Sequence, residues 1–245
     1  MRLAVFEDSF DPTDYYIVGI DTAASVNGAL CAIEVFTFRE FKQVAEAFGR
    51  IGSLHKFAEL AKNAVSWLRS QVGDNIVIAI ERNSIGQAVV ESFQDDPEFE
   101  PLLYYEEKRG ERIYGVQTTG QTKGIMTSLF YQHVCDNPSI IRSQDLKNQL
   151  LNARRNNQGN IEIPKGYKSD LFMAACFCAY ARKMWYSKLI SVVDVTVSNQ
   201  LAETLSRTPV VVKDKPKTGE QHLHDLPEII YDVDDEQDLR YIIVT

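Results

Sequence analysis

Residues 15–21 read YYIVGID, and this stretch decides the fold class. Tyr15–Ile20 is mostly β-branched and aromatic, which predicts a strand buried on both faces, and a single carboxylate, Asp21, ends it. A second apolar strand is predicted over Ile76–Ile80, and it ends in Glu81. Burying a single carboxylate among apolar residues costs free energy unless the carboxylate is paired, hydrogen-bonded or bound to a cation. The two strand ends are therefore the first candidates for a functional site.

Two more strands and a helix are predicted between these two strands. Residues 29–38 (ALCAIEVFTF) predict a strand, with Asn27-Gly28 as the hairpin signal before it. Residues 41–49 favour a third antiparallel strand. Ser53 is a good N-cap for a helix over 54–72, in which apolar residues recur at helical spacing.

Helices dominate the chain after Glu81. Asn83 or Ser84 is expected to cap a helix that runs through Phe93, and Ser169 is expected to cap the last helix. The remaining predictions are a short strand at 101–105, a loop at 106–120, helices at 122–135 and 143–151, a loop at 152–160, a small strand at 161–163 and a helix at 170–189. Early antiparallel strands followed by β–α crossovers predict an α/β fold, in which a mixed central β-sheet has helices on both faces.

The chain divides by composition into residues 1–190, predicted to be one domain, and residues 191–245, predicted to be a C-terminal appendage. Residues 191–245 contain 11 acidic and 5 basic residues, and residues 225–239 hold seven acids and no basic residue. The default interpretation of this acidic tail is a solvated extension. His222 and His224 lie within it and are not expected to form a metal site.

The net charge of −8 argues against a nucleic-acid partner, but its distribution weakens that argument. Residues 103–168 hold ten basic residues against six acidic ones, and such a local basic face can bind a polyanion. No secretory signal pattern follows Met1, and the longest apolar run, residues 171–181, is too short to span a bilayer. The cysteines show no framework spacing, so reduced thiols in an intracellular protein are expected.

A third carboxylate, Asp170, begins a helix that is apolar for its next eleven residues. Asp21 and Glu81 follow central strands, where open α/β sheets place their sites, and Asp170 can converge on them. Three carboxylates would repel one another, so the arrangement calls for divalent cations, and oxygen ligands suit Mg²⁺ or Mn²⁺. Each acid also has a structural alternative: Asp21 starts a turn, Glu81 caps the next helix or forms a salt bridge near it, and Asp170 serves its helix N-terminus.

Five segments, in this order and spacing, resemble the nuclease domain of the large terminase subunit of tailed bacteriophages. They are YYIVGIDTA, FKQVAEAFGRIG, IVIAIERNSIGQAVVESF, TTGQTKGIMTSLFYQHV and YKSDLFMAACFCAYA, and they span roughly residues 14–188. The E-R-N-S-x-G run at 81–86 is the most specific part. The resemblance implies a ribonuclease H-like fold and an endonuclease that cuts concatemeric viral DNA during packaging.

The resemblance also implies the roles of individual residues. Asp21, Glu81 and Asp170 match the family's catalytic, metal-binding acids. Two ions, Mg²⁺ or Mn²⁺, would bind across them, one to activate a water and the other to stabilise the leaving 3′ oxygen. The family's last motif usually reads His-Asp-Asp, whereas this chain has Lys168 and Ser169 before Asp170. One metal is therefore expected to bind more weakly or differently.

Several further residues are candidates for supporting roles. Asn83 is expected either to orient a ligand or to cap the next helix. Lys123 is expected either to contact a phosphate or to be a solvated surface lysine, and Lys168 is a further supporting candidate. The candidate DNA contacts lie in polar, basic segments, for which flexible loops are the alternative interpretation: Lys108, Arg109, Arg112, Arg154 and Arg155.

The sequence contains no G-x-x-x-x-G-K-[ST] run, so we expect the nuclease half alone, without the packaging ATPase motor. The partners that the resemblance implies are double-stranded DNA, the packaging ATPase domain, the portal and the small terminase subunit. The expected location is the host cytoplasm, away from membranes. Two alternatives stay open: another ribonuclease H-like nuclease, such as a junction resolvase or exonuclease, and a degenerate module that bridges DNA and proteins.

Overall fold

The computed structural model describes residues 1–22, 30–83, 85–157, 159–186, 188–189 and 240–242. Its main sheet has the strand order β10-β1-β4-β3-β2-β5. The strands are β1 Leu3–Val5, β2 Tyr16–Asp21, β3 Leu30–Thr37, β4 Gln43–Arg50, β5 Ile76–Ile80 and β10 Arg240–Ile242. Only β2 and β5 pair in parallel, and the other neighbours pair antiparallel, so the sheet is mixed as predicted.

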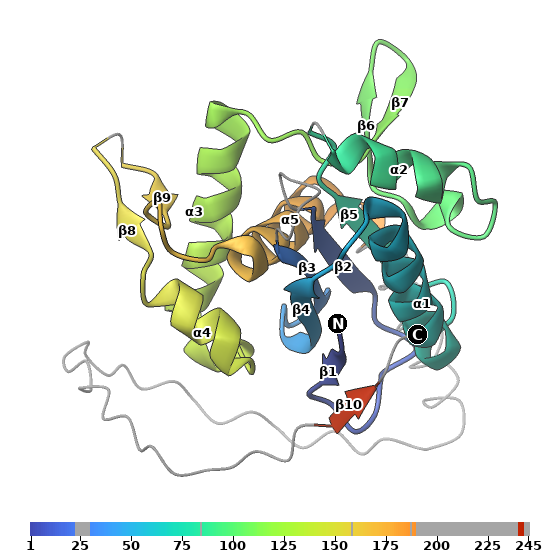
Figure 1. The fold of residues 1–245 in the computed structure, drawn as a ribbon, viewed down its shortest axis with the longest axis horizontal. Coiled ribbons are helices and arrows are strands. Elements are labelled where there is room, and N and C mark those ends of the chain that lie inside the picture. The colour runs from blue at the N-terminus through green and yellow to red at the C-terminus, as the bar shows by residue number, and fades with distance from the viewer. Residues whose placement is uncertain (23–29, 84, 158, 187, 190–239, 243–245) are drawn as a thin grey trace, which may run out of the picture.

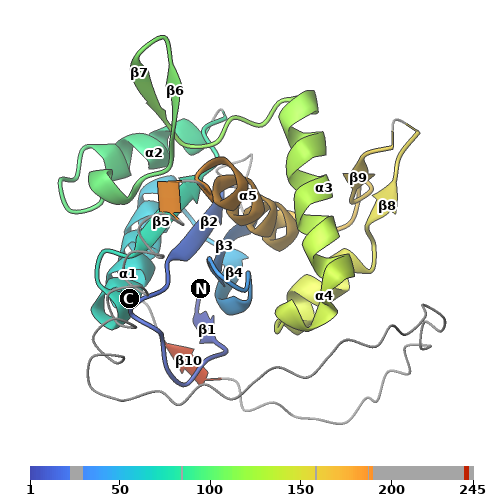
Figure 2. The same cartoon turned by 180° about the vertical axis from the view of Figure 1, so that it is seen from behind.

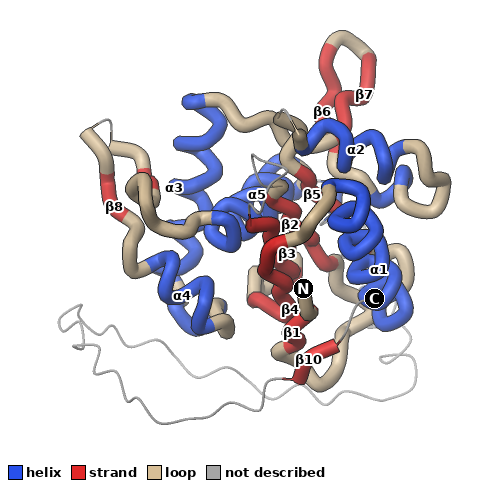
Figure 3. The backbone as a smooth tube through the Cα atoms, in the orientation of Figure 1, coloured by secondary structure: helices blue, strands red, loops and turns tan. Residues whose placement is uncertain are grey.

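Helices cover both faces of this sheet (Figures 1 and 2). On one face lie α1 Leu54–Val72 and α2 Gly86–Gln94, and on the other lie α3 Gly120–Asp136, α4 Gln144–Leu150 and α5 Asp170–Met184. Each face has its own hydrophobic cluster against the sheet. Figure 3 shows the strands running between the two groups of helices, which confirms the predicted α/β architecture.

The helices differ in how they meet the core. In α1 the Ser53 hydroxyl accepts a hydrogen bond from the Lys56 backbone N–H, as an N-cap should, and a single apolar stripe is buried. In α5 every residue from Leu171 to Ala181 is buried, because the helix lies on the sheet and α3 and α4 cover it in turn. The continuous apolar run therefore marks a central helix.

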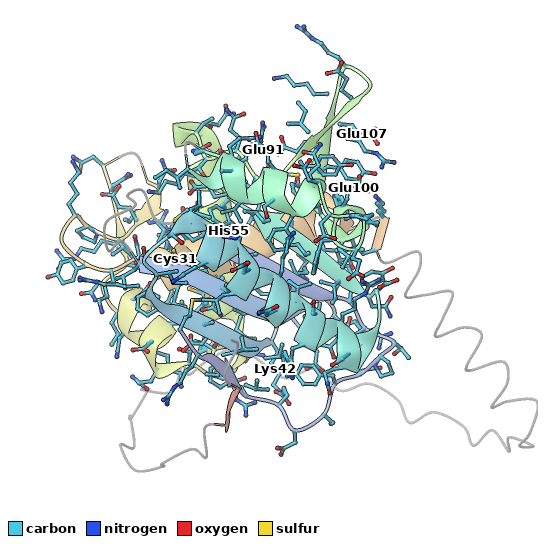
Figure 4. The ribbon with its side chains drawn as sticks, turned by 45° about the vertical axis from the view of Figure 1, so that its right-hand side comes forward. Cys31, Lys42, His55, Glu91, Glu100 and Glu107 are labelled. Atoms are coloured by element: carbon cyan, nitrogen blue, oxygen red, sulfur yellow. The ribbon has the colours of Figure 1, made fainter. Side chains whose placement is uncertain are left out.

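Several local predictions were wrong. Residues 101–105 do not form a strand: a 3₁₀ helix spans Glu100–Leu102, and Leu103 makes a single bridge to Ile78. Within the predicted loop at 106–120, β6 Tyr105–Lys108 and β7 Glu111–Tyr114 form a hairpin. This hairpin stands away from the body (Figure 1), and Figure 4 shows its projecting side chains, with Glu107 labelled.

The predicted loop at 152–160 also contains a strand, since β8 Arg154–Arg155 pairs with β9 Ile161–Glu162. A second 3₁₀ helix spans Pro138–Ile140. Two predicted caps differ as well. Ser169 occupies the N-cap position of α5 without a side-chain hydrogen bond, and α2 begins at Gly86 with no side-chain cap. The third antiparallel strand is confirmed as β4.

Other predictions fall outside the described residues: the Asn27-Gly28 hairpin signal, the cap at Ser84 and nearly all of the acidic tail. The division at residue 190 stays a prediction. The described part of the tail, β10, pairs antiparallel with β1 at the edge of the sheet. No described helix is long and apolar enough to cross a membrane. Cys135, Cys176 and Cys178 form no disulfide bond with a described residue.

Candidate active site

Asp21 and Glu81 lie side by side because β2 and β5 are parallel neighbours. Ile20 and Ile80 are register partners, so the next residue on each strand reaches the same edge of the sheet. The Glu81 backbone N–H donates to the Ile20 carbonyl oxygen over 3.1 Å, which extends the ladder to the carboxylates themselves. The predicted convergence of the two strand ends is therefore observed.

Asp170 is brought to the same edge by close packing of α5 on β2. A Cβ atom added at Gly19 would overlap the Ala174 carbonyl oxygen, so only glycine lets the helix approach this closely. The Cys178 thiol donates to the Ile17 carbonyl oxygen over 3.4 Å. Position 174 thus lies over 19 and position 178 over 17, so α5 runs antiparallel to β2. One turn before Ala174, the first residue of the helix reaches the level of Asp21.

The pKa values of these acids reflect the closeness of their negative charges. Burial raises the pKa of Asp21 well above its usual range, and the negative charges of Glu81 and Asp170 raise it further. The pKa of Glu81 is raised by burial, against the opposing effect of hydrogen bonds from Thr118 and Asp21. Two buried carboxylates this close repel each other when both are ionised, so a cation between them would stabilise the charged forms.

The donor set fits a hard divalent cation. Its atoms are carboxylate oxygens, and a buried hydroxyl oxygen beside them, Thr22 Oγ1, has no hydrogen-bond partner among the described residues. Oxygen ligands of this kind suit Mg²⁺ and Mn²⁺. No three His, Cys, Asp or Glu side chains in the described ranges are already arranged to hold an ion. A cation would therefore have to draw the acids together.

Two lysines influence the acids through their positive charge. Lys123, on the second turn of α3, lowers the pKa of both Asp21 and Glu81 through its charge. Lys168 lies with Nζ 5.4 Å from the centre of the Phe48 ring, and its charge lowers the pKa of Asp170, which burial raises. Both lysines therefore belong to the electrostatic environment of the carboxylates.

Asn83 neither caps α2 nor reaches the acids through a hydrogen bond that the structure shows. Its Nδ2 donates to the Thr118 carbonyl oxygen over 2.6 Å, just before α3 begins. The Thr119 side chain then accepts from the Thr122 backbone N–H in a capping box. Asn83 therefore ties the start of α3 to the end of β5.

The candidate DNA contacts lie on two projections rather than in the acid cluster. Lys108 and Arg109 are at the exposed tip of the β6–β7 hairpin, and the Arg112 guanidinium lies 4.7 Å from the centre of the Tyr105 ring. Arg154 and Arg155 are exposed on β8, in the second projection on the other side of α3 (Figure 1).

Sequence reasoning missed four residues that shape the site: Gly19, Thr22, Gly86 and Thr118. A Cβ atom added at Gly86 would overlap the Glu81 carbonyl oxygen and lie 2.7 Å from Thr22 Oγ1, so this glycine lets α2 start close to the site. A glycine within an apolar strand, as at Gly19, is a signal of close backbone approach and was available in the sequence. The two threonines carry no comparable signal.

The comparison with known proteins finds similarity in structure but not in sequence. No protein-family model and no curated protein matches the sequence. The large terminase nuclease from thermophilic phage G20c superposes with a TM-score of 0.50 at 13% identity, covering 73% of this chain and 87% of that one. The chain has the fold of a phage large terminase nuclease.

A second structure of the G20c nuclease, with bound magnesium, gives a TM-score of 0.51 at 13% identity and covers 73% and 86% of the two chains. The resemblance inferred from the sequence is therefore confirmed for the terminase nuclease fold. Identity this low shows the fold alone, and the activity has to be argued from the residues.

Proposed function

We propose that this chain is a divalent-metal-dependent endonuclease that cuts concatemeric viral DNA during genome packaging. The observation that carries the proposal is the meeting of Asp21, Glu81 and Asp170 at one edge of the sheet, on a terminase nuclease fold. The bound magnesium of the G20c nuclease lends support from the neighbouring structure.

The acids would act as ligands for Mg²⁺ or Mn²⁺. When bound, such a cation supplies activation of a water and stabilisation of the leaving oxygen. Hydrolysis adds that water to phosphorus and breaks the bond to the 3′ oxygen, so the products are a 5′-phosphate and a 3′-hydroxyl. Asn83 holds the neighbouring backbone in place through its hydrogen bond to the Thr118 carbonyl oxygen.

The substrate contacts follow from the two basic projections. Arg154 and Arg155 on one side, and Lys108 and Arg109 on the other, are exposed groups that would meet phosphates before base edges. Cleavage should therefore show little sequence preference and should weaken steeply with salt. The packaging role includes the packaging ATPase domain, the portal and the small terminase subunit as partners in the host cytoplasm.

Nicking of supercoiled plasmid tests this function. The wild-type chain should nick with Mn²⁺ or Mg²⁺ and stop in the presence of chelator, and Asp21→Asn should be inactive. Asp95→Asn, which removes an exposed carboxylate at the end of α2, is the matched control and should cut normally. Nicking that survives both chelator and Asp21→Asn would overturn the proposal.

The same assay separates the alternatives. A four-way junction and an end-labelled linear duplex are offered beside the plasmid. Strong preference for the junction would indicate a resolvase, and degradation only from ends would indicate an exonuclease. Binding of DNA with no cleavage by a folded wild-type chain would favour the degenerate module.

A further inference from the structure

Arg82 directly follows Glu81, and its side chain contacts the base of the β6–β7 hairpin. Its Nη2 donates to Gln117 Oε1 over 2.9 Å and lies 3.7 Å from Glu106 Oε2 on β6. Only 17% of the side chain is exposed, and Nε is buried without a hydrogen-bond partner among the described residues. An arginine enclosed in this way is placed to hold other parts of the protein and not to grip DNA itself.

The backbone around Arg82 joins the end of the hairpin to the end of β5. The Arg82 N–H donates to the Val116 carbonyl oxygen over 2.9 Å, and the Val116 N–H donates to the Ile80 carbonyl oxygen over 2.7 Å. Gly115 has a φ of 80°, and a Cβ atom there would lie 2.9 Å from the Ile80 carbonyl oxygen and 3.1 Å from Arg82 Cβ. The chain that leaves β7 is therefore packed directly against the strand end that carries Glu81.

Glu106 is held from a second side by α5. The Tyr180 hydroxyl donates to Glu106 Oε1 over 3.3 Å, so the two oxygens of this carboxylate face two different elements. Beside it, the Trp185 Nε1–H donates to the Tyr105 carbonyl oxygen over 3.1 Å, and the centres of the two rings are 5.1 Å apart. The base of the hairpin is thus fastened to β5, which ends at one candidate acid, and to α5, which begins at another.

The rest of the hairpin is exposed. Residues 107–112 lie at the surface, and the two strands project from the body (Figures 1 and 4). A strand advances about 3.4 Å per residue, so the tip at Arg109 lies about 10 Å beyond Glu106. A tilt of roughly 10° at the base would move the tip by about 2 Å, which is more than a hydrogen bond to a phosphate tolerates. The direction of the hairpin therefore depends on the contacts that hold Glu106.

We propose that Arg82 is a positioning residue. Through Glu106 it sets the direction of the hairpin relative to the strand-end acids, so that a DNA strand bound at the hairpin tip presents its phosphodiester to them. The inference rests on the proposed function and deepens it. An ion pair with this exposure contributes about 0–1 kcal/mol to stability, so the chain should stay folded without it and lose only the direction of the hairpin.

The direction of the hairpin can be measured without DNA and without metal. Spin labels are attached to Glu111→Cys, near the tip, and to Ser66→Cys, on the exposed side of α1, in a full chain that also carries Cys135→Ser to remove an exposed thiol. Double electron–electron resonance then gives the distribution of distances between the two labels.

Arg82→Gln and Glu106→Gln should each broaden this distribution, because each removes one half of the ion pair. Glu107→Gln is the matched control, since it neutralises the neighbouring, exposed acid on the same strand, and it should leave the distribution unchanged. An Arg82→Gln distribution as narrow as that of the wild type would overturn the inference.

Plasmid nicking then tests whether this direction matters for cutting. At saturating DNA, Arg82→Gln should slow nicking by about 10- to 100-fold, because a misplacement of about 1 Å at a reacting group has an effect of this size. The KM for DNA should change by less than about threefold, because the cations at the tip are retained. The control Glu107→Gln should nick at the wild-type rate.

A double-mutant comparison separates positioning from a general structural effect. In a chain that carries Lys108→Ala and Arg109→Ala, the tip no longer holds a strand, so adding Arg82→Gln should slow nicking no further. Effects that multiply would show that Arg82 acts independently of the tip and would refute the positioning role. A wild-type chain that cuts no DNA would refute the nuclease instead, and the spin-label distances would still decide whether Arg82 holds the hairpin.

Discussion

Gly19→Ala is the sharpest test of how the fold assembles the site. The added methyl group would overlap the Ala174 carbonyl oxygen and approach Cys178 Sγ to 2.7 Å. Backbone cannot swing aside as the end of a side chain does, so α5 must move back by about 1 Å before an ordinary contact is restored. Overpacking of this kind costs about 1–3 kcal/mol.

A smaller effect opposes this cost, because alanine restricts the unfolded chain more than glycine and thereby recovers about 0.4–1 kcal/mol. The net loss in the free energy of unfolding should be about 1–2 kcal/mol, which lowers Tm by roughly 2–8 °C in a domain of this size. The variant should therefore still fold. Its α5 carries Asp170, however, and a displacement of about 1 Å at a reacting group can slow a reaction about 100-fold.

Thermal unfolding and plasmid nicking, measured well below the lowered Tm, should report these two effects separately. Gly52→Ala is the matched control, because a Cβ atom at Gly52 meets nothing within 4 Å. If Gly19→Ala matches Gly52→Ala in both Tm and nicking rate, then α5 does not lie on β2 as described, and the placement of Asp170 beside Asp21 is wrong.

Three further predictions concern charge. Glu81→Gln and Asp170→Asn should each abolish nicking while thermal unfolding shows a metal-free Tm no lower than wild type, because carboxylate repulsion is relieved; wild-type cutting rates would refute the site. Burial, with the Asp145 charge, raises the pKa of Glu46 to about 7, so the folded state binds the extra proton. Stability to urea should then fall by up to about 3 kcal/mol between pH 4.5 and 7, and Glu46→Gln should flatten that slope. Replacing Arg154 and Arg155 by alanine should weaken DNA binding and reduce its salt slope by about 2 in a fluorescence titration, and an unchanged slope would exclude both contacts.

The sequence predicted the central elements well, for a physical reason. A strand buried on both faces does not alternate between apolar and polar residues. In the sequence, β2 and β5 are therefore continuous apolar runs, each followed by an acid. The same holds for α5, which is covered on all sides. Such elements are specified locally, and neither their neighbours nor their partners need to be known.

The elements that were missed lack this local signal. The β6–β7 hairpin consists mainly of charged residues and is held by its own backbone ladder and by a turn in which Arg109 and Gly110 adopt positive φ. The strands β1, β8 and β10 are two or three residues long, too short for any periodicity, whereas the small strand predicted at 161–163 is confirmed as β9. Their pairing depends on distant segments.

The candidate site also has a part that could be predicted from the sequence and a part that could not. The parallel register of β2 and β5 could be anticipated, and it places Asp21 beside Glu81. The position of Lys123 could not be anticipated from the sequence, because it depends on a hydrogen bond from Asn83 to Thr118, which lie 35 positions apart in the chain. A surface lysine and a catalytic-site lysine look alike in a single sequence.

A second acid pair on the same face of the sheet shows what distinguishes the candidate site. Glu34 and Glu46 are cross-strand partners on β3 and β4, and Glu34 is also paired with Gly19, so both side chains share the face of Asp21. Gln43 Nε2 donates to Glu34 over 2.7 Å and to Glu46 over 3.4 Å. Burial, together with the Glu46 charge, raises the pKa of Glu34 well above its usual range.

This interior pair is thus balanced by the protein itself, with the Gln43 amide donor in place of a cation. The same Gln43 side chain accepts the backbone N–H groups of Arg142 and Ser143, each over 2.8 Å, and so fastens the start of α4 to the sheet. Asp21 and Glu81 differ because they stand at the strand ends, and the exposed Lys123 of α3 acts on both through its charge. Carboxylate pairing alone therefore does not define a metal site in this fold, and the strand-end position is what separates the candidate pair from the interior one.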